Sequence, residues 1–527
     1  MSEPVSVRID HRTAVAEAGS SVAAALENAG ERVCRRSVCG EGRGVLCAMG
    51  ICFECRVTID GVAHRRACME LCRDGMVIET GEVRPQVSGL RSQASSFVSL
   101  VETESIECDV AVVGGGPAGV AAACRIAESG AKTVVLDEGA TPGGQIYRHR
   151  PNREPPEAAR PWLDRLARSR AIVRSATSVF DAVRRGAGWR LCAEGPGGTC
   201  RIDAGALVLA TGARELFLPF PGWTLPGVMG AGGAQALWKS GGSIRGRTAV
   251  VAGSGPLLLA VGASLARAGA NVAVVAEQAR RGSLLRFAGG LVRFPGKLVE
   301  AARYRAGFFA AAYRAGTWVA EARGGGRLES VALTDGVDRF EIRCDIAAIG
   351  YGLVPNTELP RLLGCEIRGG TVVVDSRQQT SVPGVFCAGE PCGVAGLDVA
   401  VAEGELAGLA AAGHAAPSAE ARRLSATRSR GRRLAVVMDA TFRPREELRS
   451  LARADTIVCR CEDVRLAALA PFAGIREAKL STRAGMGPCQ GRVCGPALAF
   501  LFGWDSDTVR PPIKPVALGS LLQEDSA

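Results

Sequence analysis

The stretch "DVAVVGGGPAGVAAACRIAESGAKTVVLDE" (Asp109–Glu138) decides the fold of this chain of 527 residues. Its pattern predicts a strand, a glycine-rich turn, a helix and a second strand, with G-x-G-x-x-G directly after the first strand. Glycines there permit a tight turn, close approach of a pyrophosphate and close packing of helix on strand. An acid that ends the second strand accepts hydrogen bonds from ribose hydroxyls, and Asp137 has the better register for it. The predicted dinucleotide-binding residues are Gly114, Gly116, Pro117, Ala118, Gly119, Asp137 and Glu138.

A second copy of the pattern, "TAVVAGSGPLLLAVGASLARAGANVAVVAE" (Thr248–Glu277), begins about 140 residues after the first. It keeps Gly253 and Gly255 but has Leu258 at the third glycine position, which is expected to push the helix away from the strand. Glu277 ends the second strand, and an acid there favours NAD over NADP. Three alternatives stay open for this site: NAD, another adenine nucleotide, or a degenerate copy that binds nothing.

Three further segments carry a resemblance: "TPGGQI" (Thr141–Ile146), "LVLATGARE" (Leu207–Glu215) and "TSVPGVFCAGEPCG" (Thr380–Gly393). They resemble the FAD signatures of the two-dinucleotide-binding flavoproteins, an α/β fold of the glutathione- and thioredoxin-reductase type. The resemblance implies bound FAD, with Glu390 standing where the family has Asp. The residues it adds to the FAD site are Gly144, Gln145, Thr211, Gly212, Gly389 and Glu390. The cysteine pair that disulfide reductases carry after "GG" is absent, which argues against that activity.

The segment "GVLCAMGICFECRV" (Gly44–Val57) begins a cysteine quartet with the spacing C-x4-C-x2-C and a later fourth cysteine. This is the plant-type [2Fe–2S] spacing, and the glycines at 44 and 50 are expected to let backbone N–H groups reach the sulfurs. Zinc sites more typically show two C-x2-C pairs, and a redox dithiol needs only two cysteines. The predicted ligands are Cys47, Cys52, Cys55 and Cys68.

A second quartet lies near the other end, in "IVCRCEDV" and "TRAGMGPCQGRVCGP". Its spacing, C-x-C and then C-x4-C, closely resembles the bacterioferritin-associated-ferredoxin-like [2Fe–2S] domain. Zinc is the alternative, because four thiolates hold either metal. The predicted ligands are Cys459, Cys461, Cys489 and Cys494.

These motifs predict an α/β flavoprotein with a small N-terminal β-grasp ferredoxin-like domain and a small helical C-terminal [2Fe–2S] domain. The predicted boundaries are 1–85 for the ferredoxin-like domain, 86–106 for a connector, 107–240 and 340–415 for the FAD domain, 241–339 for the second nucleotide domain, 416–450 for an Arg-rich linker, 451–510 for the C-terminal domain and 511–527 for a tail.

Composition limits the partners. The net charge is +11, but the cluster "RRLSATRSRGRR" (Arg422–Arg433) has no interleaved aromatic residues, so we predict no nucleic acid partner. The uncharged run Ala249–Ala266 is long enough for a membrane span, yet its "GSGP" turn favours strand, turn and helix. Nineteen cysteines without a visible secretory signal predict a cytoplasmic protein, membrane-associated only through partners.

Together with the motifs, "PGWTLPGVMGAGGAQALWKSGG" (Pro221–Gly242) resembles the α-type subunits of heteromeric amine and imino-acid dehydrogenases. This group includes hydrogen cyanide synthase, opine oxidase, D-hydroxyproline and proline dehydrogenases and, more distantly, sarcosine oxidase. The resemblance implies a hetero-oligomer in which an amine-oxidase-like FAD subunit, similar to glycine or sarcosine oxidase, oxidises the C–N bond. It further implies an FMN at the subunit interface, a further small subunit, and electron transfer through this chain to an acceptor.

Two other functions stay open: a stand-alone NADH-dependent flavoprotein reductase that passes electrons through its clusters, and a non-enzymatic scaffold with metal sites. No general acid or base is predicted, because the four histidines fall near turns or connectors. The substrate itself stays open, since its pocket is expected on another chain.

Overall fold

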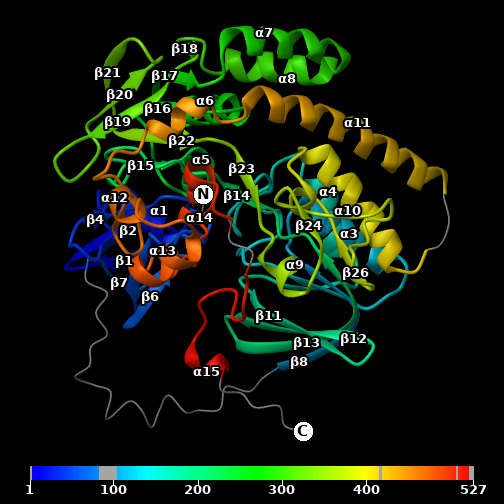
Figure 1. Cartoon of the computed structure of the whole chain (residues 1–527). Coiled ribbons are helices and arrows are strands. Elements are labelled where there is room, and N and C mark those ends of the chain that lie inside the picture. Colours follow the sequence, from blue (N-terminus) through cyan, green and yellow to red (C-terminus); the bar gives the residue numbers. More distant parts are fainter. Residues whose placement is uncertain (1–2, 82–103, 415–417, 506–507, 522–527) are drawn as a thin grey trace. The chain divides into compact units, whose positions relative to one another are not determined.

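The computed structural model describes residues 3–81, 104–414, 418–505 and 508–521, which form two compact units (Figure 1). Unit 1 comprises Met1–Arg84, Glu215–Leu353 and Val436–Ser506, and unit 2 comprises Pro85–Arg214, Val354–Ala435 and Asp507–Ala527. Most of the predicted connector at 86–106, and the last six residues of the predicted tail, lie outside the described residues.

The N-terminal part of unit 1 is a five-stranded sheet in the order β2-β1-β7-β5-β6, in which β1 and β7 are parallel. Alternating buried and exposed side chains in β1 and β5 give the sheet one apolar face, which the buried residues of α1 cover. Ser21 caps α1 by accepting a hydrogen bond from Ala24 N at 3.2 Å. This is the predicted β-grasp order. Its elements are β1 (Pro4–Ile9), β2 (Arg12–Glu17), α1 (Val22–Asn28), β3 (Arg35–Arg36), β4 (Gly42–Arg43), β5 (Arg56–Ile59), β6 (Val62–Arg66) and β7 (Met76–Glu79).

A parallel five-stranded sheet in the order β15-β22-β16-β17-β18 forms the middle of unit 1. Its strands and flanking helices are β15 (Val228–Gly230), α5 (Ala231–Lys239), β16 (Thr248–Gly253), α6 (Leu257–Arg267), β17 (Asn271–Glu277), α7 (Arg281–Gly290), α8 (Pro295–Ala306), β18 (Ala312–Ala315) and β22 (Ile346–Gly350). The uncharged run at 249–266 is thus a strand, a turn and a helix, as predicted. In the part of the chain that the structure describes, no helix combines the length and apolarity needed to cross a bilayer.

The structure places the second nucleotide domain's boundaries differently from the prediction of 241 and 339. Strand β15 pairs in parallel with β22, and β22 pairs with β16, so residues from Glu215 to Leu353 belong to one unit. Two short strands, β14 (Ala213–Glu215) and β23 (Leu353–Pro355), lie where the chain passes between the units. The pairing of β15 with β22 joins strands more than 100 residues apart, so the periodicity of the sequence cannot predict it.

Unit 1 is completed by an antiparallel three-stranded sheet and the C-terminal elements. These are β19 (Trp318–Arg323), β20 (Ser330–Thr334), β21 (Arg339–Arg343), a 3₁₀ turn at Glu446–Ser450, β27 (Ile457–Cys459), β28 (Val464–Arg465), α12 (Leu466–Leu469), α13 (Ile475–Thr482) and α14 (Cys494–Phe502).

Unit 2 contains a seven-stranded sheet in the order β10-β9-β8-β13-β12-β11, with β26 also pairing with β13. Strands β9, β8, β13 and β26 run parallel, so their carboxyl ends lie along one edge. The elements are β8 (Glu104–Val113), α3 (Pro117–Glu128), β9 (Thr133–Leu136), α4 (Arg160–Arg168), β10 (Ile172–Arg174), β11 (Ser178–Arg185), β12 (Gly188–Gly195), β13 (Gly198–Leu209), α9 (Glu358–Leu362), β24 (Ile367–Arg368), β25 (Thr371–Val372), β26 (Val385–Cys387), α10 (Leu397–Ala411) and α15 (Leu518–Leu521).

The segment predicted as an Arg-rich linker at 416–450 is for the most part a helix, α11 (Ala419–Phe442). Its alanines, leucines and arginines all have high helix propensity, and within unit 2 Leu424 is buried beside Leu406. Arg432 pairs with the buried carboxylate of Glu403 at 2.6 Å. The helix begins in unit 2 and ends in unit 1.

Candidate functional site

The four N-terminal cysteines are all buried and lie in two contacting pairs. Cys47, Cys52 and Cys55 follow one another in the loop between β4 and β5, and Cys68 follows β6. The Cys47 and Cys52 side chains are hydrogen-bonded to each other, as are those of Cys55 and Cys68. Their spacing places the first three sulfurs in one loop. The β5–β6 hairpin brings the chain back, so that Cys68 lies next to this loop.

Backbone N–H groups of the same loop point at the sulfurs. Gly50 N donates to Cys68 Sγ at 3.2 Å, and Cys52 N donates to Cys47 Sγ at 3.4 Å. Gly50 has a φ of +78°, and a Cβ there would lie 2.7 Å from Met69 Sδ. The predicted role of Gly50 is therefore confirmed: only a residue without a side chain lets this backbone approach the sulfurs.

The second quartet is built on a hairpin and a helix start. Cys459 ends β27, Cys461 lies in the turn before β28, Cys489 lies in the loop between α13 and α14, and Cys494 is the first residue of α14. Cys459 contacts Cys494 through a side-chain hydrogen bond, and Cys461 contacts Cys489. A Cβ on Gly487 would lie 2.2 Å from Cys461 Cβ, so this glycine admits the "GMGPCQGRVC" loop to the hairpin.

The electrostatics of both quartets favour one thiolate in each pair. The hydrogen bond with Cys52 and those from nearby backbone N–H groups lower the pKa of Cys47 to about 6, although burial opposes them. The corresponding contact with Cys494 lowers the pKa of Cys459 to about 7. Burial raises the pKa of Cys52 well above its ordinary value. Thiolates are the form that binds iron or zinc, so both pairs are prepared for a metal.

The donor sets fit a [2Fe–2S] cluster. Each quartet supplies four buried sulfurs in two adjacent pairs, and two sulfurs per iron is what a cluster with two irons takes from the protein. Within the described ranges no three His, Cys, Asp or Glu side chains are arranged around a point as ligands of a single metal ion. The structure thus brings the eight predicted ligands together as four contacting pairs, two from each quartet.

The predicted FAD residues of unit 2 lie at the carboxyl edge of the parallel strands, where α/β sheets bind ligands. Gly114 follows β8, and a Cβ there would lie 2.2 Å from Ala210 O. Gly119 lies in α3, and a Cβ there would lie 1.8 Å from Gly114 O. The close helix–strand packing expected of these two glycines is therefore present. Pro117 is the first residue of α3, and a Cβ on Gly389 would lie 3.0 Å from Ala118 Cβ.

Two further glycines bring bare backbone together beside the α3 N-terminus. A Cβ added to Gly116 would meet only Gly144 Cα within 4 Å, at 3.9 Å. Gly144 has a φ of +58° and approaches Gly116 from the "PGGQ" turn, in which Gln145 accepts a hydrogen bond from Arg148. Backbone without side chains at a helix N-terminus fits a pyrophosphate, so this cradle fits the dinucleotide expected there.

The two acids after β9 have separate partners. Asp137 accepts hydrogen bonds from the backbone N–H groups of Gly115 and Gly139, and burial raises its pKa. Glu138 instead accepts from Ser178 and pairs with Lys514. Asp137 thus ties the glycine loop to the end of β9.

The remaining predicted FAD residues come together after β13 and β26. Thr211 donates from Oγ1 to Asn356 O at 2.7 Å, and Gly389 N donates to Glu403 at 3.0 Å. The buried Glu390 accepts from Ala213 N and lies 3.9 Å from a Cβ built on Gly212. Burial raises the pKa of Glu390. The longer side chain thus reaches the loop after β13.

The second dinucleotide motif forms the expected turn in unit 1. A Cβ on Gly253 would lie 1.8 Å from Gly350 O, while Gly255 faces open space. The carboxylate of Glu277 accepts from Gly255 N at 2.7 Å and Ala279 N at 2.8 Å, and burial raises its pKa to about 7. Leu258, the second residue of α6, is fully buried in the core, so the helix packs on the sheet despite the missing third glycine, contrary to the expected displacement.

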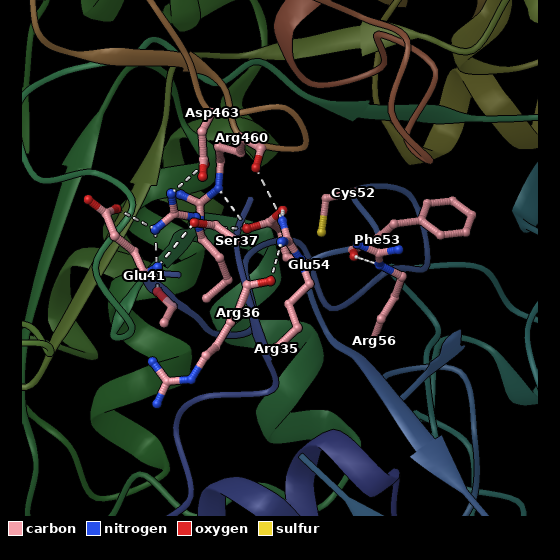
Figure 2. Close-up of polar contacts among 12 residues, drawn as sticks. Arg35, Arg36, Ser37, Glu41, Cys52, Phe53, Glu54, Arg56, Arg460 and Asp463 are labelled. Carbon is pink, nitrogen blue, oxygen red and sulfur yellow. Dashed lines mark hydrogen bonds and ion pairs between the residues drawn. The ribbon is translucent and has the colours of Figure 1, made fainter. Parts of the chain in front are cut away.

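Sequence reasoning missed three charged residues around the cysteines. Glu54 lies between Cys52 and Cys55, Arg460 lies between Cys459 and Cys461, and the two side chains form a buried ion pair that Arg35 joins (Figure 2). The signal in the sequence was one acidic residue between Cys52 and Cys55 and one basic residue between Cys459 and Cys461.

Comparisons with known proteins agree with this geometry. Residues 108–404 match the model of the pyridine nucleotide-disulphide oxidoreductase family, and residues 2–82 match a 2Fe-2S iron-sulfur cluster binding domain. One of the opine oxidase subunits of Agrobacterium tumefaciens (strain Ach5) is 32% identical over 78% of this chain and 91% of the relative. Hydrogen cyanide synthase subunit HcnB of Pseudomonas aeruginosa is 32% identical over 76% of this chain and 92% of the relative.

One solved structure shares the fold over nearly the whole length. L-proline dehydrogenase from P. horikoshii superposes with a TM-score of 0.71 at 20% identity, covering 99% of this chain and 98% of the other. The described fold, the two cysteine quartets and these similarities lead to one assignment: the chain belongs to the pyridine nucleotide-disulphide oxidoreductase family, in the group that holds these opine oxidase and hydrogen cyanide synthase subunits.

Proposed function

We propose that this chain is the electron-transfer subunit of a multi-subunit dehydrogenase that oxidises an amino or imino acid. In this proposal a partner flavoprotein subunit, related to amine oxidases, holds the substrate and its own FAD. The observation that carries the proposal is the presence of two cysteine quartets beside a dinucleotide fold, in a chain that covers 91% of an opine oxidase subunit. Catalysis by this chain alone would need neither quartet.

The cofactors we assign to this chain are FAD and two [2Fe–2S] clusters. When bound, a flavin exchanges electron pairs and single electrons, and each cluster exchanges single electrons. The glycine cradle of Gly116 and Gly144 would hold the pyrophosphate, and the two quartets would hold the clusters. The cysteines of both quartets are buried, which would keep water away from the clusters.

The second nucleotide site supports NAD or another adenine nucleotide. Gly255 faces open space at the turn, as a pyrophosphate requires. Among the described residues, the buried hydroxyl of Tyr351 finds no protein partner, and it lies close enough to Glu277 to feel its charge. An unsatisfied buried hydroxyl costs about 1–3 kcal/mol, which a bound polar ligand would offset.

The test is reconstitution. The chain is expressed alone and with an amine-oxidase-like subunit from the same host, and reduction of an artificial acceptor is followed with opines, hydroxyproline, proline and glycine. We expect turnover only from the complex, with the chain alone slower by about 100-fold or more, because the substrate pocket lies on the partner. Full turnover by the isolated chain would contradict the proposal. Cofactor analysis of the complex by mass spectrometry reports any interface FMN.

A second function, a stand-alone NADH-dependent reductase, is favoured by the intact turn of the second dinucleotide motif. Stopped-flow mixing of the isolated chain with NADH separates the two functions. Rapid bleaching of the flavin absorbance would favour the reductase, whereas an unchanged flavin spectrum at millimolar NADH would exclude it.

A further inference from the structure

The two cysteine quartets are far apart in sequence but share one hydrophobic core in unit 1. Cys47 and Cys52 of the first quartet lie in the same cluster of buried residues as Cys459, Cys461, Cys489 and Cys494 of the second. The loop from Cys47 to Cys55 and the hairpin around Cys461 are therefore neighbours. Packing alone leaves such loops free to slide, since apolar contacts have no direction.

A buried ion pair joins the two ligand loops directly. Arg460 Nε donates to Glu54 Oε2 at 3.0 Å, and Arg35 Nη2 donates to Glu54 Oε1 at 2.5 Å (Figure 2). All three side chains are at most 3% exposed. Glu54 stands between two ligands of one quartet and Arg460 between two ligands of the other, 406 positions later. A shift of either loop would break this pair.

Arg460 is held from its other side as well. Its Nη1 donates to Trp223 O at 2.6 Å, and its guanidinium lies 4.8 Å from the centre of the Trp223 ring. Trp223 Nε1 in turn donates to Ile457 O at 2.6 Å, at the start of β27. Arg35 Nη2 also donates to Arg460 O at 3.2 Å. The arginine between the cysteines therefore has one defined orientation.

A second buried pair repeats the connection. Arg43, which lies just before the first ligand loop, donates to Asp463 at 2.7 Å, and both side chains are at most 2% exposed. Asp463 lies just after Cys461 and also accepts from Cys39 N at 2.9 Å. Two independent bridges thus span the same pair of loops.

Buried ion pairs are costly, because desolvation offsets much of the attraction, so they are weak evidence for stability alone. They are best attested where they specify one register. Here three arginines face three carboxylates, those of Glu54, Asp463 and the exposed Glu41, so the bridges between the two loops are balanced in charge.

We propose that the Glu54–Arg460 ion pair, with Arg35 and the parallel Arg43–Asp463 pair, is a positioning device that holds the two cluster sites in contact as direct neighbours. This inference rests on the proposed function, because both quartets must bind clusters. Glu54 and Arg460 act as positioning residues through the loops that carry the ligands.

The first test is EPR spectroscopy of the reduced full-length protein that contains both clusters, since neighbouring paramagnetic centres split and relax each other. We expect splittings that stay constant in field units at two microwave frequencies. We also expect the N-terminal cluster to relax at least twofold faster in the wild type than in Cys461→Ser, which lacks the second cluster. Two independent spectra with equal relaxation would overturn the proposal.

The second test uses Glu54→Gln, with Glu27→Gln as the matched control. Glu27 lies in α1 of the same unit and pairs with Arg247. We expect Glu54→Gln to reduce the splitting at least twofold with the iron content retained, and Glu27→Gln to leave it unchanged. An unchanged splitting in Glu54→Gln would contradict the role of the pair. If Glu54→Gln does not fold, Arg460→Lys takes its place. This variant keeps the positive charge but loses the guanidinium donors, and we expect the same reduction of the splitting.

Metal analysis separates this inference from the proposed function. Four irons and four sulfides per chain without magnetic interaction would overturn the positioning role and leave the function intact. Two irons per chain would overturn the two-cluster function, and this inference with it. Four irons with the interaction present in the wild type and reduced in Glu54→Gln would support both.

Discussion

At the scale of single residues, glycines decide where the cofactor sites form. Gly114 and Gly119 have no room for a side chain, because backbone oxygens lie within 2.2 Å of the position a Cβ would take. Gly116 differs, since a Cβ there would meet only Gly144 Cα within 4 Å, at 3.9 Å. The same residue type therefore serves close packing at two positions and leaves room for a ligand at a third.

Gly119→Ala is expected to remove the flavin. Its Cβ would lie 1.8 Å from Gly114 O, which forces α3 away from β8 and distorts the turn. We expect the flavin absorbance per protein to fall by about tenfold, which corresponds to about 1.4 kcal/mol of binding free energy. Gly197→Ala is the control, because a Cβ there meets nothing within 4 Å. Normal flavin content in Gly119→Ala would contradict this prediction.

Glu277 predicts a pH dependence of stability. Burial raises its pKa from 4.5 to about 7, so between these values the folded state binds a proton that the unfolded state does not. The free energy of unfolding therefore falls as the pH rises through this window. The side chain in Glu277→Gln stays neutral at every pH. We therefore expect its gain in the free energy of unfolding over the wild type to be larger at pH 8 than at pH 5, by about 2 kcal/mol.

The measurement for Glu277→Gln is thermal unfolding at both pH values. Glu477→Gln, at an exposed position of α13, is the control and should show no such difference. A difference between Glu277→Gln and wild type that does not change with pH would argue that the carboxyl is ionised throughout.

At the scale of elements, the proposed C-terminal cluster site depends on one loop meeting one hairpin. The hairpin of β27 and β28 presents two cysteines, and α14 presents a third at its first residue. Cys494 thus lies at a helix N-terminus, where its contact with Cys459 lowers the pKa of the Cys459 thiol. Gly487 lets the loop with the fourth cysteine approach.

Gly487→Ala is expected to empty the C-terminal site alone. Its Cβ would lie 2.2 Å from Cys461 Cβ, so the loop must move away from the hairpin. We expect about half of the iron and acid-labile sulfide to be lost, because the N-terminal quartet is untouched. Gly495→Ala, where a Cβ meets nothing within 4 Å, should keep all of it. Full iron content in Gly487→Ala would show that the loop adapts.

At the scale of the whole molecule, the ferredoxin-like part is built into unit 1. Residues of α1 and of α5 belong to one hydrophobic core. Asn28 donates to Gly241 O at 3.0 Å and accepts from Ser243 N at 2.6 Å, and Glu27 pairs with Arg247. Deleting this part would therefore expose apolar surface on the second nucleotide domain.

Removal of residues 1–81 is expected to lower the unfolding temperature of unit 1 by roughly 10 °C or to cause aggregation, because the shared core is opened. Calorimetry and the soluble fraction measure this. Asn28→Ala is the graded control, because it removes two hydrogen bonds and leaves the core, and should cost about 1–2 kcal/mol. A truncated chain as stable as the wild type would mean that the two parts fold independently.

The sequence by itself determined the features that depend on local spacing. Both dinucleotide turns, the β-grasp strands and the two sets of four cysteines follow from patterns within a few tens of residues, where backbone geometry limits the outcome. The Arg-rich segment was predicted as a linker from its charge, but its residues have high helix propensity and form α11. The domain boundary at Glu215 was displaced because pairing of β15 with β22 leaves no periodic signal.

Only the tertiary structure decided which distant segments meet. In the sequence, Glu54 lies two positions from Arg56 and Arg460 lies two positions from Glu462, so nothing local indicates that Glu54 and Arg460 pair with each other. The fold brings Glu54 and Arg460 into a buried pair, because the N-terminal and C-terminal cysteine loops share one core. Long-range contacts of this kind depend on the complementarity of whole elements, and no window along the chain contains both partners.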